Sequence, residues 1–160
     1  MTFRSHIQSA LALTLVAASI STAQAETASS SFQVGMEVTA TCSITAADMT
    51  FSGITTGTTS QKDADSSLTV NCSNGAPYSV SLSNGENFSG GRRLGGAGSF
   101  INYSLFKDPS RTAEWSLASP ISGLGSGTTQ VHTVYGRIPS GQSVPNMGSY
   151  ADTIVATVSY

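Results

Sequence analysis

The sequence predicts an all-β protein folded as an immunoglobulin-like sandwich. Apolar residues recur at every second position in short runs, which is the spacing that places them on one face of a strand. Clusters of Gly, Ser, Thr and Asn separate these runs, and no run keeps the spacing of a helix. About seven short strands with turns between them are typical of such a sandwich.

Residues 1–25 have the features of an export signal. Arg4 precedes an apolar stretch from about Ala10 to Ile20, and Ala23-Gln24-Ala25 forms a small-x-small cleavage site. The stretch is too short, and too interrupted by Ser and Thr, to span a bilayer as a helix. We therefore expect this signal to be removed during export to the periplasm, with no direct insertion of the chain into a membrane.

The predicted strands follow one another along the rest of the chain. The first run alternates from Phe32 to Ile44. The sequence predicts further strands at 49–54, 67–72, 78–83, 100–107, 130–138 and 150–160, with a looser segment at 115–121. Asn74-Gly75 and Asp108-Pro109 are turn signals, and Arg92-Arg93 lies in a glycine-rich stretch that we interpret as a solvated loop.

Two of these strands do not fit a self-contained sandwich. Residues 32–44 would extend about 43 Å, more than twice a typical strand, which predicts an outer piece at 31–38 and an inner piece at 39–44. The run 150–160 continues to the last residue with no strand after it. A sandwich that ends in this way can lack its last strand and carry an open apolar groove. The spare strand at one end therefore matches the missing strand at the other.

Cys42 and Cys72 are the only cysteines, and in an exported chain an even pair predicts one disulfide. The bond would tie the first long strand to a later one. Because it closes a loop of about 31 residues, the chain-entropy model predicts a stabilisation of about 3–4 kcal/mol. We interpret this pair as a structural element rather than a reactive site.

Few residues offer chemistry for catalysis or for cofactors. Only 10% of residues are charged and the net charge is −2, which argues against nucleic acid and anionic lipid as partners. His132 is the only histidine after the signal, and we expect a structural, half-exposed imidazole. Asp48, Asp63 and Asp65 lack the spacing of a calcium loop and fit a solvated acidic turn better. The sequence therefore predicts no enzyme activity, no metal and no cofactor.

Fragments spread over nearly the whole chain after the signal form one recognisable set. They are Phe32-x-Val34-x-Met36-x-Val38 leading to Cys42, Leu68-Thr69-Val70-Asn71-Cys72, Tyr103-Ser104-Leu105-Phe106-Lys107-Asp108 with Arg111 behind it, Tyr135-Gly136-Arg137-Ile138, and Gly148-x-Tyr150-x-Asp152-Thr153-Ile154-Val155-x-Thr157-Val158-x-Tyr160. Together they resemble the spore coat protein U domain family, which includes the Csu-type pilins of archaic chaperone–usher pili. The terminal block is the most specific of these fragments.

The resemblance implies an incomplete immunoglobulin-like sandwich that lacks its last strand and is completed by donor-strand complementation. It divides the chain into the signal at 1–25, an N-terminal donor-strand extension at 26–38 and a spore coat U/pilin domain at 39–160. The implied donor side chains, which would fill the groove of a neighbouring subunit, are Phe32, Val34, Met36 and Val38. The implied residues of the final strand, which would border the groove and contact the chaperone, are Ile154, Ala156, Val158 and Tyr160.

The resulting hypothesis is a structural, non-enzymatic pilus subunit that supports adhesion or biofilm formation. Its implied partners are a periplasmic chaperone, an outer-membrane usher and other pilin subunits, and its implied destination is the cell surface. One alternative is a monomeric secreted sandwich that binds carbohydrate, with Trp115 and Tyr78 as an aromatic platform. Another alternative, within the same family, is a structural protein of a spore coat.

Overall fold

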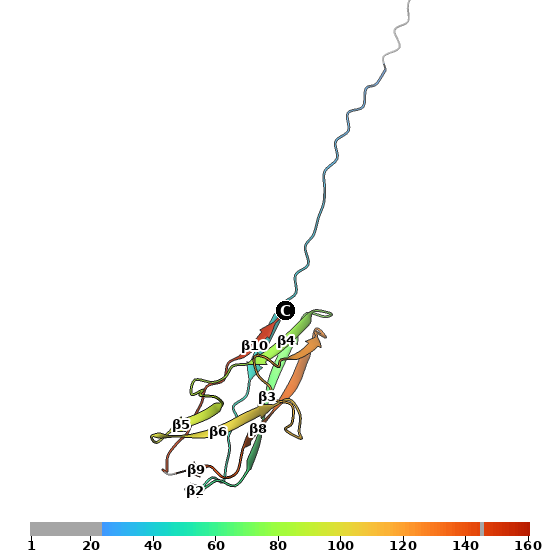
Figure 1. Ribbon diagram of the computed structural model, residues 1–160. Coiled ribbons are helices and arrows are strands. Elements are labelled where there is room, and N and C mark those ends of the chain that lie inside the picture. Colours follow the sequence, from blue (N-terminus) through green and yellow to red (C-terminus); the bar gives the residue numbers. More distant parts are fainter. Residues whose placement is uncertain (1–23, 145) are drawn as a thin grey trace, which may run out of the picture. The chain divides into compact units, whose positions relative to one another are not determined.

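A computed structural model gives the structure of residues 24–144 and 146–160 (Figure 1). All regular secondary structure in these residues is β, as predicted, and none of them belongs to a helix long and apolar enough to cross a bilayer. The predicted export signal lies outside the described residues, apart from its last two positions. The strands are β1 (Cys42–Ala46), β2 (Gly57–Thr58), β3 (Lys62–Cys72), β4 (Pro77–Leu82), β5 (Arg92–Gly96), β6 (Ser99–Phe106), β7 (Ile121–Leu124), β8 (Thr129–Ile138), β9 (Ser143–Val144) and β10 (Ala156–Ser159).

The strands form two main antiparallel sheets. One has the order β1-β3-β8-β6-β5 and the other has the order β10-β4-β7, while β2 and β9 pair separately. β3 and β8 are the longest strands and lie side by side over most of their length (Figure 1). Buried side chains from both main sheets belong to a single apolar cluster, so the two sheets pack face to face as a sandwich.

The period-two pattern of the sequence determines which side chains enter this core. Along β4 the buried residues are Tyr78, Val80 and Leu82, whereas the serines between them are half-buried. Successive side chains of a strand point to opposite faces, so the apolar set faces the second sheet. β6 repeats the pattern with Ile101, Tyr103 and Leu105. The predicted strands at 78–83, 100–107 and 130–138 are thereby confirmed to within one residue at each end.

Trp115 and His132 both have structural roles, which the sequence predicts for His132. Trp115 is 1% exposed, and its Nε1–H donates a hydrogen bond of 2.9 Å to the Val80 carbonyl oxygen. His132 is half-buried, and its Nε2 lies 2.9 Å from the hydroxyl oxygen of Tyr78. Burial lowers the pKa of this imidazole, because desolvation disfavours the charged form.

The prediction of a solvated loop at Arg92-Arg93 was wrong. Arg92 lies in β5 and is 4% exposed, and its guanidinium donates hydrogen bonds to the carbonyl oxygens of Leu82 and Ser83. Its Nη1 also lies 3.7 Å from the Glu114 carboxylate. A charged group is buried at acceptable cost when it is hydrogen bonded and paired, and here the acceptors come from the other sheet.

The acidic turn predicted around Asp63 and Asp65 was also wrong, because both residues lie in β3. Asp63 forms a bidentate pair with Arg137 on the neighbouring β8, with N–O distances of 2.7 and 2.8 Å. Asp65 accepts a hydrogen bond of 2.6 Å from Arg111. The hydrogen bond from Arg137 lowers the pKa of Asp63. These acids therefore connect β3 to β8 and to the segment that contains Arg111.

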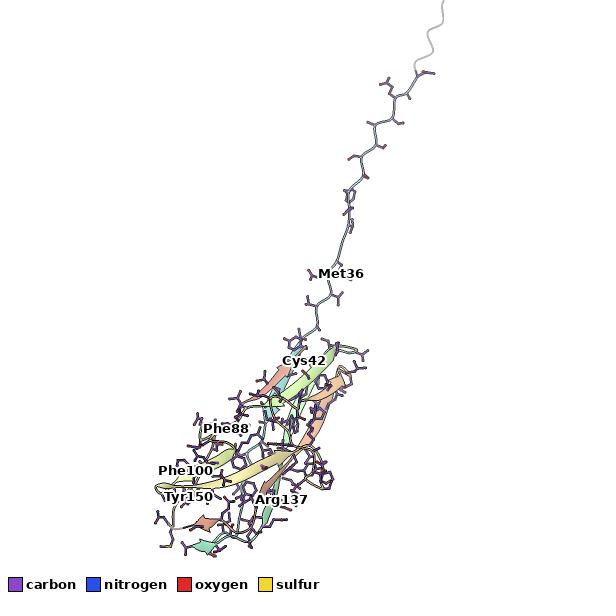
Figure 2. The ribbon with its side chains drawn as sticks, in the orientation of Figure 1. Met36, Cys42, Phe88, Phe100, Arg137 and Tyr150 are labelled. Carbon is purple, nitrogen blue, oxygen red and sulfur yellow. A yellow bond between two sulfur atoms is a disulfide. The ribbon has the colours of Figure 1, made fainter. Side chains whose placement is uncertain are left out.

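The predicted disulfide between Cys42 and Cys72 is present (Figure 2 labels Cys42). The two residues are directly opposite in the β1–β3 ladder, with their Cα atoms 4.1 Å apart. Such close Cα atoms are typical of a pair that exchanges no backbone hydrogen bonds.

Replacing both cysteines, Cys42→Ser with Cys72→Ser, should lower the free energy of unfolding by about 3–4 kcal/mol, because the unfolded chain regains the entropy of the open loop. Chemical denaturation of the two proteins measures this difference. Equal denaturation midpoints for the double variant and the oxidised parent would contradict the stabilising role.

Candidate functional site

β1 and β10 are edge strands that belong to different sheets. Each stands at the end of its sheet's strand order, and the two strands contain Cα atoms within 8 Å of each other. No β-pairing joins β1 to β10 within the described residues. The sandwich therefore has a seam along which two sheet edges face each other without a shared ladder.

Along this seam each edge offers backbone groups at alternate residues. On β1 the bonds to β3 are made at Thr41, which accepts from the Ser73 N–H, and at Ala47, which donates to the Ser67 carbonyl. Because bonding alternates along an antiparallel ladder, the backbone groups of the residues at even positions point away from β3. These residues are Cys42, Ile44 and Ala46.

The same alternation applies to β10. Val155 exchanges bonds with Ser83, whose N–H donates to the Val155 carbonyl and whose hydroxyl accepts from the Val155 N–H. The register therefore directs the backbone groups of Ala156 and Val158 away from β4. Both edges carry free backbone groups, as β-augmentation requires, and because their Cα atoms come within 8 Å of each other an added strand has to move the edges apart.

Next to this seam the core opens into a groove. We call residues 46–56 the N-terminal wall and residues 146–156 the C-terminal wall. Two hollows, of about 420 and 720 Å³, lie between these walls and share Met49, Phe51, Leu94 and Tyr150 in their linings, so the groove is continuous. Its floor is apolar and comes from several strands, with Leu68, Leu82, Leu105 and Val134 among its residues.

Hydrogen bonds brace the C-terminal wall. Ala151 exchanges backbone bonds of 2.8 and 3.0 Å with Gly95 of β5. The Asp152 carboxylate accepts a hydrogen bond of 2.7 Å from the Tyr103 hydroxyl and one of 3.0 Å from the Asn87 N–H. Burial and the bond to Asp152 raise the pKa of Tyr103, so the hydroxyl keeps the proton that it donates. This wall is thus held in place before any strand is added.

The N-terminal wall is held differently. Its start is fixed by the bond between Ala47 and Ser67, but the described residues show no backbone–backbone hydrogen bond from Met49 to Thr56. Met49 and Phe51 instead pack over Gly136 of β8, where a Cβ atom would collide with both side chains. This wall therefore has free backbone groups and depends on side-chain packing.

The strand predicted at 49–54 was wrong, because this stretch of the N-terminal wall has no ladder partner. Its apolar spacing is nevertheless meaningful, because Met49, Phe51 and Ile54 are half-buried against the core. The apolar residues of this stretch thus indicate its inward face, but not that the segment borders a groove.

Only some of the residues predicted for the final strand lie at the groove. Ile154 and Ala156 line the groove, and Val158 is half-buried against the core. Tyr160 lies outside β10 and is 62% exposed. Of the predicted strand 150–160, only Ala156–Ser159 forms a strand, and Ala151 makes an isolated bridge to Gly95.

The predicted donor residues carry exposed apolar side chains. No strand is assigned to residues 24–41, and β1 begins only at Cys42. Met36 stands on a stretch of chain without secondary structure (Figure 2). The exposed fractions are between 81% and 87% for Phe32, Val34, Met36 and Val38. Four large apolar side chains at alternate positions form an unusual surface for a soluble protein and suggest a partner.

The comparisons with known proteins agree with this geometry. Residues 28–157 match the Spore Coat Protein U domain. The chain belongs to this family. It is 38% identical over 73 residues to Protein U of Myxococcus xanthus, an alignment that covers 43% of this chain and 40% of that protein.

The fold of this Spore Coat Protein U domain is also found in a solved structure. It is similar to a chain in the crystal structure of the CsuC-CsuE chaperone-tip adhesion subunit pre-assembly complex from archaic chaperone-usher Csu pili of Acinetobacter baumannii. The TM-score is 0.58 and the identity 28%, over 77% of this chain and 40% of that chain. The chain thus spans about two fifths of both relatives. This similarity supports the prediction of an incomplete immunoglobulin-like sandwich.

Proposed function

We propose that this Spore Coat Protein U domain is a structural subunit of a surface pilus, polymerised by donor-strand exchange. The observation that carries the proposal is the seam between β1 and β10, where two edges with free backbone groups adjoin an apolar groove. An extended segment with apolar residues at every second position has the shape and chemistry that such a groove accepts.

The donor segment, residues 31–38, supplies those side chains. Phe32, Val34, Met36 and Val38 share one face of an extended chain, and each contributes about 1.5–3 kcal/mol when it moves from water into an apolar site. Backbone hydrogen bonds to both edges add to this stabilisation and determine the register. A joint of this kind is durable without any covalent bond between subunits.

The same groove explains the proposed partners. An exposed apolar groove is prone to aggregation, so a periplasmic chaperone fills it during transit and an outer-membrane usher exchanges that strand for the next subunit's donor segment. The similarity to a chain of a chaperone–subunit complex supports this step. The assembled pilus would lie on the cell surface and support adhesion or biofilm formation, without enzyme activity, cofactor or nucleic acid.

The structure disfavours the carbohydrate-binding alternative, because Trp115 and Tyr78 are 1% and 4% exposed and provide no aromatic platform. The match to Protein U favours a second candidate, a structural role in a spore coat. That role would use the same groove and donor segment. Electron microscopy separates the two, because it shows fibres in one case and a surface layer in the other.

Deleting residues 26–38 should abolish fibres, because the subunit keeps its groove but loses the strand that fills its neighbour's groove. The measurement is electron microscopy of cells that express the variant with the chaperone and usher. The matched control deletes residues 26–31 only, which spares the apolar face, and should retain fibres. Normal fibres from the longer deletion would reject the linking role.

A further inference from the structure

The junction, residues Thr39, Ala40 and Thr41, separates the donor segment from β1. Its last residue, Thr41, is bonded to Ser73 through both its backbone and its side chain. The Thr41 N–H donates a hydrogen bond of 3.0 Å to the Ser73 hydroxyl, and the Thr41 carbonyl accepts one of 2.9 Å from the Ser73 N–H. The two hydroxyl oxygens are 3.2 Å apart. Thr41 is therefore an additional residue of the β1–β3 ladder, held extended.

The direction of the β1 backbone restricts how the donor segment can return to its own domain. The first residue with backbone groups on the groove edge is Cys42, because those of Thr41 point to Ser73. A returning strand must therefore pair from Cys42 onward. In a short turn that ends at Cys42, Thr41 lies inside the turn and has to lose its bonds to Ser73.

The alternation of side chains between the two faces of a strand restricts the length of that turn. Residues opposite each other in a ladder point to the same face, so the donor residues at even positions must stand opposite even positions of β1. The shortest allowed turn places Val38 opposite Cys42 and contains the three junction residues. A two-residue turn would bring odd positions such as Gln33 and Glu37 onto the apolar face.

The junction has the wrong chemistry for a three-residue turn. Such turns combine a type I turn with a third residue in the left-handed region, which usually requires glycine. The third residue here is Thr41, whose branched Cβ makes a positive φ a genuine outlier. Neither Thr39 nor Ala40 belongs to the residue types that favour turns.

We propose that Thr41, held by Ser73, prevents the donor segment from folding back into the groove of its own subunit, so that only a second copy of this chain receives it. This inference rests on the proposed function and adds to it a residue that determines the choice of acceptor. This restriction requires no other protein, because it comes from one extended residue and from a junction that lacks turn-forming residues.

The test builds the turn that the natural junction lacks. The triple variant Thr39→Pro, Ala40→Asp, Thr41→Gly has the residues of a type I turn followed by a left-handed glycine. The mature chain, residues 26–160, is refolded with its disulfide intact in the presence of a fluorescent peptide of residues 31–38. Peptide binding and polymer formation are then measured by size-exclusion chromatography.

We expect the unmodified chain to bind the peptide and to polymerise, and the triple variant to remain monomeric. In the triple variant, the chain's own donor segment competes with the peptide for the groove. Its effective concentration is on the order of 1 mM, so with the peptide at about 10 μM it should reduce peptide binding by about 100-fold. Adding Met36→Asp to the triple variant should restore peptide binding, because the charged segment no longer competes.

The matched control reverses the order of the new residues, with Thr39→Gly, Ala40→Asp and Thr41→Pro. Proline at position 41 removes the N–H that Thr41 donates to Ser73, but it cannot adopt the left-handed conformation, so this control should bind peptide like the unmodified chain. Peptide binding by the triple variant equal to that of the unmodified chain would overturn the role of the junction alone. No peptide binding by the unmodified chain would overturn the proposed function and this inference together.

Discussion

Trp115→Ala should lower the free energy of unfolding by about 3–5 kcal/mol, the range for removing a large aromatic side chain from a core. Trp115 is 1% exposed and is the largest of the fully buried side chains among the described residues. The variant also leaves the Val80 carbonyl without the indole N–H that lies 2.9 Å from it. Val80 belongs to β4, which pairs with β10, so the damage extends to the edge of the groove.

Trp115 is the only tryptophan, so circular dichroism rather than fluorescence should follow its unfolding in denaturant. Both proteins carry the peptide of residues 31–38, so that the groove is filled equally. The control Trp115→Phe keeps an aromatic ring and loses the hydrogen bond, and we expect it to be less destabilising than the alanine variant. A loss below about 1 kcal/mol for the alanine variant would show that the cavity collapses freely.

Alternation predicted the inner strands well because burial of one face is a local property of the sequence. Val80 and Leu82 must lie on one side of any extended chain, and Ser81 between them on the other. β4, β6 and β8 each have neighbours on both sides, so an extended segment with an apolar face becomes a ladder there. The disulfide was predictable because the sequence contains only two cysteines, which leaves a single possible pairing.

Alternation alone does not say whether a partner strand exists. Residues 32–40 alternate as clearly as β4, and Met49 and Phe51 begin the same pattern, yet neither 32–40 nor 49–54 is paired. A strand is defined by backbone bonds to a neighbour, and the sequence of one strand contains no information on that neighbour. The unpaired stretches are the parts to which the proposed function assigns a second subunit.

Arg92 shows a second limit. Arginine beside glycines indicates a solvated loop by composition, because guanidinium groups are rarely buried. The acceptors that permit burial are the carbonyls of Leu82 and Ser83, which lie on another strand and are brought close only by the packed sandwich. Asp152 is similar, since its partners Tyr103 and Asn87 come from distant parts of the sequence.

The candidate site was therefore only half predictable. The terminal pattern indicated Ile154 and Ala156 as one border of the groove, and both line it. The opposite border is the N-terminal wall, within which the sequence predicts a strand of the sandwich at 49–54. Only the structure shows that Met49 and Phe51 pack over Gly136 without a ladder, beside an open hollow.

Met36→Asp should produce polymers that dissociate far more readily than those of the unmodified chain. In the proposed joint Met36 is central in the donor face, and its burial contributes about 1.5–3 kcal/mol. A carboxylate in the same apolar site forfeits this contribution and adds the cost of a buried charge without a partner. The expected loss per joint is at least about 3 kcal/mol, or more than about 100-fold in the dissociation constant.

The measurement is the fraction of polymer that survives heating in denaturant, assayed by gel electrophoresis without boiling. The matched control is Gln33→Asp, which adds the same charge at an odd position, on the opposite face of the extended segment. A charge on that face stays hydrated, so the control polymers should dissociate like those of the unmodified chain. Equal resistance of the Met36→Asp and Gln33→Asp polymers would mean that the even positions do not enter a neighbour's groove.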